Sequence, residues 1–143
     1  MGVTLDRFLH FGPHCSLKEK TRPRIRQLKK LTGRSWGLEE RQLRVVAQGF
    51  IRGAMEHAAA AWLPAMPPSH VELLEREMRT VGRTITACLA LISTPAHAVM
   101  AEADLMPVAA RREALTARFL GKALALPQED PLRRVAEATP PCV

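Results

Sequence analysis

The residues of this sequence best suited to chemistry are seven lysines and arginines between positions 18 and 30. Four of them, Lys18, Arg22, Arg26 and Lys29, follow one another at helical intervals of four, four and three, which lines up their charges along one face. Lys20, Arg24 and Lys30 lie beside that row. Were six of these groups to neutralise phosphates of a duplex, log affinity would fall with log salt at a slope of about −5. We therefore predict that these seven residues bind nucleic acid without base preference.

The excess positive charge of the protein lies in the same region. The chain has 143 residues and a formal net charge of +7. Residues 1–34 hold nine basic and two acidic side chains, whereas the remaining 109 residues hold twelve of each sign. A cationic field concentrated at one end favours a polyanionic partner, of which an RNA or DNA duplex is the simplest. The alternatives are a merely solvated cationic helix and an acid-poor organelle-targeting segment in residues 1–34, against which Asp6, Pro13 and Pro23 argue.

Other residues offer little chemistry. His10, His14 and Cys15 could form part of a metal site, but no second pair follows at structural-zinc spacing. The three aspartates do not cluster as two-metal phosphoryl transfer requires, and no glycine-rich phosphate loop is present. We expect no catalytic residue, no metal site and no cofactor. His57 is expected to be a hydrogen-bonded core residue, and Cys88 a small packing residue.

Composition limits the class of protein. Hydrophobic residues make up 47% of the chain, charged residues 24% and aromatic residues 4%, which indicates a globular helical protein with an aliphatic core. No apolar run approaches the roughly 18 residues of a membrane span, so we expect no membrane association of that kind. Three cysteines, odd in number and widely spaced, favour free thiols.

The expected elements are mostly helices. Residues 1–12 alternate as a short extended segment followed by a turn, and residues 14–31 have helical spacing. Pro23 lies inside that second pattern and removes a backbone donor, so we expect a break near Arg22 and a second helix from Pro23. A long helix is expected from Leu38 to Leu63.

The apolar stripe expected to be buried along that long helix follows intervals of three and four: Leu43, Val46, Phe50, Ala54, Ala58 and Ala61. Ala47, Ile51, Met55 and Trp62 widen it. The three alanines of the row, Ala54, Ala58 and Ala61, would let another helix approach closely. A helical interaction module that receives a partner helix on this alanine face is therefore another open alternative for the function of the chain.

Further helices are expected downstream. Ser69 with Glu72 matches a capping box, and Thr94 before Pro95 matches a helix start. The glutamates at 39, 40, 72, 75 and 77 would complement helix dipoles in first turns. A last helix should run from Pro107 to Pro127. The expected fold is an all-α bundle of four to five helices over residues 1–126, with a short N-terminal extended segment and a frayed, flexible tail over residues 127–143.

The order of several motifs resembles the region after the palm in reverse transcriptases of non-LTR retrotransposons, most closely the Jockey and ingi groups. The motifs are Gly2 to Arg7, then Phe11, Pro13 and His14, then the basic helix ending in Leu31-Thr32-Gly33, Trp36-Gly37, Ala54 to Pro64, Leu73 to Cys88, Thr94-Pro95, Glu102-Ala103, Pro107 and Arg111 or Arg112. Residues 1 to about 126 are covered. The chain departs from the family at His57-Ala58, where Tyr-Gly is usual, and at Ala87, where glycine is usual.

This resemblance implies a thumb and connection fragment of a truncated or degenerate open reading frame. The palm, with its paired catalytic aspartates, would lie upstream, so this chain would not be an enzyme by itself. In that family the thumb helices hold the template and primer, and the location of such a protein is expected to be nuclear. The expected partners are nucleic acid and either the missing palm or a helical protein.

Overall fold

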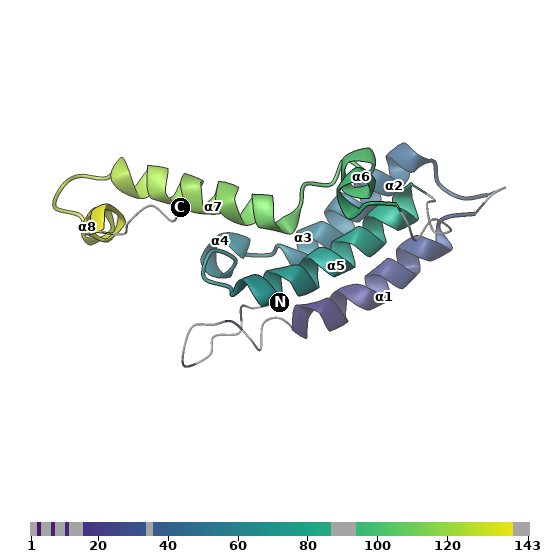
Figure 1. The fold of residues 1–143 in the computed structure, drawn as a ribbon, viewed down its shortest axis with the longest axis horizontal. Helices are drawn as coiled ribbons and strands as arrows, with labels where there is room; N and C mark the ends of the chain where they lie inside the picture. Colours follow the sequence, from purple (N-terminus) through teal and green to yellow (C-terminus); the bar gives the residue numbers. More distant parts are fainter. Residues whose placement is uncertain are drawn as a thin grey trace.

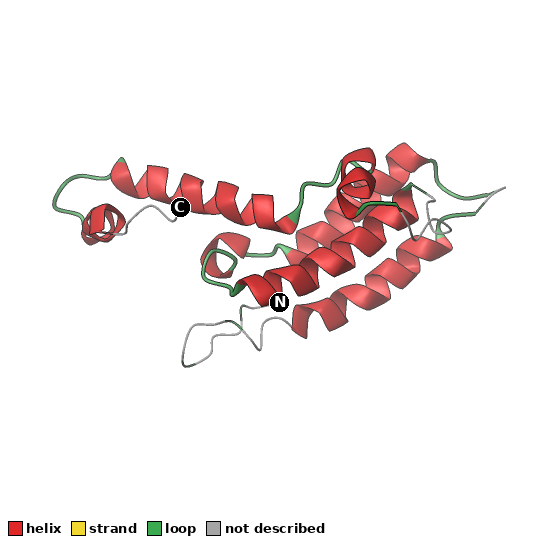
Figure 2. Ribbon diagram, viewed as in Figure 1, coloured by secondary structure: helices red, strands yellow, loops and turns green. Residues whose placement is uncertain are grey.

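The computed structural model describes residues 3, 7, 11, 16–33, 36–86 and 94–138. The described part of the chain contains helices and loops but no strand, so the all-α fold class is confirmed (Figures 1 and 2). The extended segment expected in residues 1–12 lies outside the described residues except at Val3, Arg7 and Phe11.

Helix α1 spans Leu17–Lys30 and lies along one side of the helical body (Figure 1). Among its described side chains, Thr21, Ile25 and Leu28 are buried and form one narrow stripe. The expected break at Arg22 is wrong, because α1 continues through Pro23. Because Pro23 has no amide hydrogen, the carbonyl of residue 19 loses its helical hydrogen bond. Residues 19 and 23 are both exposed, so water can hydrogen bond to that carbonyl instead. Ile25 and Leu28 meanwhile hold the second half of the helix against its neighbours.

The single long helix expected between Leu38 and Leu63 is divided. It consists of α2, η2, α3 and α4, which span Glu40–Val46, Ala47–Arg52, Gly53–Met55 and Ala59–Trp62. The residues expected to widen the stripe are confirmed as buried, together with Leu43: they are Ala47, Ile51, Met55 and Trp62. Val46 is partly buried, whereas Phe50, Ala58 and Ala61 of the expected central row are exposed, so that row is wrong at these three positions. The reason is the π-helical turn η2, whose wider turns keep residues four apart on one face.

A turn at Glu56–Ala58 separates α3 from α4. Ala58 has a φ of 53°, in the left-handed region that L-residues avoid. Trp62 is buried beneath the turn, and its Nε1 donates to the His57 carbonyl oxygen at 2.9 Å. The side chain of His57 is exposed, so its expected core position is wrong. The turn also prevents Ala54, Ala58 and Ala61 from forming one helix face.

Helix α5, Pro68–Ile85, is the central helix and lies beside α1 (Figure 1). It buries Val71, Leu74, Met78 and Val81. The expected capping box at Ser69 and Glu72 is wrong, because the helix begins at Pro68 with no side-chain cap. Pro67 and Pro68 start this helix through their fixed φ instead.

Three helices complete the described chain. They are α6, α7 and α8, spanning Ala96–Glu102, Val108–Leu124 and Pro131–Ala138. The helices expected after Pro95 and Pro107 are confirmed, although Thr94 supplies no cap. Residues 131–138 form α8 where a frayed tail was expected, and residues 139–143 lie outside the described part.

The start of α7 is held to the body by three polar contacts. The amide of Val108 donates to Glu75 Oε2 at 2.6 Å, and Arg111 Nε lies 3.1 Å from Glu56 Oε2. Arg112 Nη2 donates to the Pro64 carbonyl oxygen at 3.0 Å. From this anchor α7 extends away from the bundle, and α8 packs against its far end (Figure 1).

The left-handed turn gives a stability prediction. We expect Ala58→Gly to raise the free energy of unfolding by roughly 0.5 kcal/mol, because relief of about 1 to 2 kcal/mol of steric strain exceeds the added entropy of the unfolded chain. Ala60→Gly, at an exposed helical position of α4, should instead lower it by about 1 kcal/mol. Urea denaturation of both variants measures the difference. If both variants lost the same free energy of unfolding, Ala58 would not be strained.

Candidate nucleic-acid interface

Outside its buried stripe, α1 carries exposed cations. Lys20, Arg26, Lys29 and Lys30 are exposed, and among the described residues none of their side chains has a hydrogen bond or an ion pair. Lys18 lies within α1, but its side chain is outside the described part, so its role stays a prediction. Four charges on one rigid helix are therefore available to an anion.

Arg22 is at the edge of the stripe and contacts α5. Its Nε lies 3.2 Å from Glu77 Oε1, and the side chains of Arg22 and Glu77 are 54% and 14% exposed. A pair this open contributes at most about 1 kcal/mol to stability. Glu77 nevertheless neutralises the charge of Arg22, so this residue is a weaker phosphate ligand than its spacing indicates.

Arg24 lies at the opposite edge and holds α1 to η2. Its Nη1 donates to the Phe50 carbonyl oxygen at 2.6 Å, and its guanidinium carbon is 4.8 Å from the centre of the Phe50 ring. Both contacts use the planar guanidinium, the second as a cation–π interaction. Arg24 is therefore occupied by packing, unlike the lysines on the outer face.

The neighbouring helix α5 carries further cations. α1 and α5 run side by side in the same direction (Figure 1). The Arg22–Glu77 ion pair joins them. Arg76 is exposed next to Glu77, and Arg83 follows two helical turns later on the same face. Neither has an ion pair within the described ranges. The only sequence signal for them is their spacing of seven, which does not reveal that α5 lies beside α1.

The glutamates of α5 do not have the role expected of them. α5 has no acidic residue in its first turn, so the expected dipole interaction of Glu72, Glu75 and Glu77 is wrong. Glu72 pairs with Arg79, Glu75 accepts the amide of Val108, and Glu77 pairs with Arg22. Glu40 does lie in the first turn of α2, and Glu39 is the N-cap residue of that helix, with its amide donating to Gln42 Oε1 at 3.1 Å.

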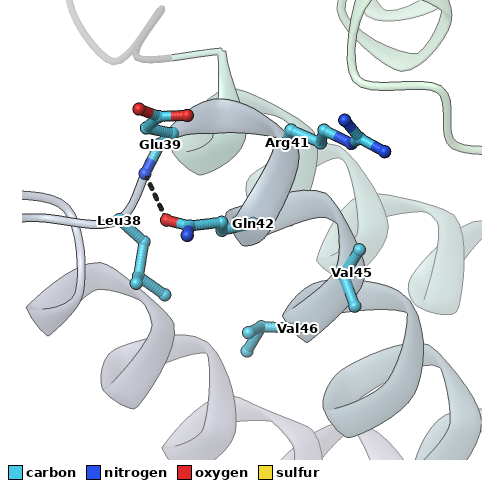
Figure 3. A pocket seen from close by; sticks show the side chains of 6 residues that line it. All are labelled: Leu38, Glu39, Arg41, Gln42, Val45 and Val46. Carbon is cyan, nitrogen blue, oxygen red and sulfur yellow. Dashed lines mark hydrogen bonds between the residues drawn. The ribbon is translucent and has the colours of Figure 1, made fainter.

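An open hollow of about 530 Å³ lies beside α2 (Figure 3). Its described lining residues are Leu38, Glu39, Arg41, Gln42, Val45 and Val46. Glu39 and Arg41 point in different directions, and Gln42 and the apolar side chains of Leu38, Val45 and Val46 make up the rest of the wall (Figure 3). This lining supplies no nucleophile and no acid–base pair.

The described ranges contain neither a cluster of metal-ligating side chains nor a helix that could span a membrane. No three His, Cys, Asp or Glu side chains there gather in a group that could hold a metal ion. His10, His14, Cys15 and Cys88 lie outside the described residues. None of the described helices combines the length and apolar character needed to cross a bilayer.

Comparison of the chain with family models, with curated proteins and with solved structures finds no match.

The two kinds of cation on α1 can be separated by their effect on stability. Arg24→Ala should lower the free energy of unfolding by about 1 kcal/mol, because it removes the bond to the Phe50 carbonyl and the contact with its ring. Arg26→Ala, on the outer face of the same helix, should change it by less than about 0.5 kcal/mol. Urea denaturation of both variants provides the measurement. If both substitutions changed the free energy of unfolding equally, Arg24 would not be distinguished from Arg26 by its packing contacts.

Proposed function

We propose that this chain binds nucleic acid through phosphate contacts made by the outer face of α1. The observation that carries the proposal is the exposure of Lys20, Arg26, Lys29 and Lys30, without partners among the described residues, on a helix fixed to the body by Ile25 and Leu28. Fixed cations release condensed counterions when they meet phosphates, which drives binding. Arg76 and Arg83 extend the surface onto α5, since packed helices lie about 8 to 10 Å apart.

The same chemistry defines what this surface recognises. Lysine ammonium groups act as point charges, and phosphate contacts position a ligand without reading its bases. Binding should therefore be weak, steeply dependent on salt, and indifferent to sequence. The described part of the chain offers no acid–base pair or metal cluster beside these cations, and we propose no reaction for this chain alone.

As the origin of the chain, we propose a thumb and connection fragment of a non-LTR retrotransposon reverse transcriptase. One structural detail supports the resemblance. The residue that stands where the family has glycine is Ala58, and its φ of 53° is the conformation that glycine adopts without strain. The second departure, Ala87, lies outside the described residues. In the parent enzyme the paired aspartates would lie beyond these 143 residues, and α1 would hold a template and primer duplex.

A salt titration tests the α1 surface. For a blunt duplex of random sequence, Arg26→Ala/Lys29→Ala/Lys30→Ala should reduce the slope of log affinity against log salt by about 2.7, because each lost phosphate contact removes about 0.9. Fluorescence anisotropy with a labelled duplex measures it.

The matched control for that triple variant is Arg118→Ala/Lys122→Ala/Arg134→Ala. These three cations are exposed on α7 and α8, away from α1, and their removal lowers the net charge by the same amount. The control should keep the slope of the unmodified protein. If both triple variants changed the slope equally, binding would depend on net charge rather than on the α1 surface.

The extension onto α5 is tested separately with Arg76→Ala. We expect the slope of log affinity against log salt to become shallower by about 0.9, since one phosphate contact is lost. The same duplex titration measures the change. An unchanged slope would restrict the interface to α1.

A further inference from the structure

Trp36 is an exposed aromatic residue in the loop that follows α1. Its side chain is 71% exposed, whereas Trp62, the other tryptophan, is 1% exposed and hydrogen bonded. The chain has no tyrosine and four phenylalanines, and Trp36 is the most exposed of the aromatic side chains that the structure describes, ahead of Phe119 at 52% and Phe50 at 40%. Among the described residues, no hydrogen bond of the Trp36 indole is found.

The loop holds this indole in a defined position. The amide of Gly37 donates to the Gly33 carbonyl oxygen, and the amide of Leu38 to that of Leu31, each at 2.9 Å. A Cβ atom at Gly33 would lie 2.7 Å from Trp36 Cε2 and 2.8 Å from Nε1, which is closer than real Cβ atoms come. The indole therefore rests on the bare backbone of Gly33 while most of its surface faces solvent.

The position of the indole relates it to the cationic surface. Lys29 and Lys30 form the last turn of α1, and Leu38 returns to Leu31 directly after that turn. A strand whose phosphates contact Lys29 and Lys30 thus reaches the loop of Trp36 at the end of the helix. Positive charge with an adjacent open aromatic face is the combination that binds single strands, because every unpaired base has a face that can stack.

We propose that Trp36 is a stacking platform for an unpaired base of the strand held by α1. The inference rests on the proposed function and names its ligand class: nucleic acid with a single-stranded segment, such as an overhang next to a duplex. Within a blunt duplex the base faces are already stacked on one another, so Trp36 contributes little to binding it.

The test uses the full chain with two probes, a twelve-nucleotide thymidine single strand and a blunt duplex of twelve base pairs. Stacking should quench the fluorescence of Trp36 when the single strand binds, and the buried Trp62 should contribute little to that change. Trp36→Ala should weaken binding of the single strand roughly tenfold and leave that of the duplex within twofold. Trp36→Phe, which keeps an aromatic face, should recover most of the loss.

The outcomes separate the two proposals. If the unmodified protein binds neither probe at low salt, the nucleic-acid function itself is wrong. If it binds both probes without quenching and Trp36→Ala binds the single strand equally well, phosphate binding stands and the stacking platform is wrong. Circular dichroism shows that the variants are folded, and the quenching measurement on the unmodified protein is independent of any substitution.

Discussion

The charges of α1 must stay in water, and this constraint decides how the rest of the chain packs. Removing an unpaired ammonium or guanidinium from water is far more costly than one apolar contact can offset. α1 therefore docks along Thr21, Ile25 and Leu28, with its remaining described positions at the edge or in solvent. Because α5 and η2 occupy the two sides of that stripe, the orientation of α1 is fixed. The outer face of the protein at this point is then necessarily cationic.

The same constraint divides the cations of α1 by their angle around the helix. Arg22 and Arg24 lie at the two edges, where a long side chain can reach a neighbouring helix, and each makes such a contact. Lys20 and Lys30 are exposed, and their side chains have no ion pair among the described residues. A row defined by intervals of four and three crosses from edge to outer face, so periodicity alone could not separate binding residues from packing residues. On α1 the interface we propose has fewer residues than the sequence indicates, because Arg22 and Arg24 are engaged in packing contacts. It gains residues on α5 instead.

The helices were predicted best from the sequence where no tertiary contact opposes the local preference of the backbone. The helices after Pro95 and Pro107 begin where a fixed φ starts them. Prediction from the sequence failed where tertiary contacts override local preference, as at Pro23, which α1 tolerates on its solvent side. The π-turn η2 and the left-handed Ala58 leave no local signal, because alanine favours helices. Those two features moved the buried stripe and exposed His57.

Because α7 is bonded to the body only at its N-terminal end, its two halves should differ in their protection from hydrogen exchange and from proteolysis. Val108, Arg111 and Arg112, in the first two turns of α7, bond to the body. Beyond Leu115, the only buried residue of α7 is Ala123. Opening its C-terminal half breaks contacts with α8 alone and spares the core. Amide hydrogens near Gly121 should consequently exchange with deuterium long before those near Leu115, and a protease that cuts there would remove α8 without unfolding the remainder.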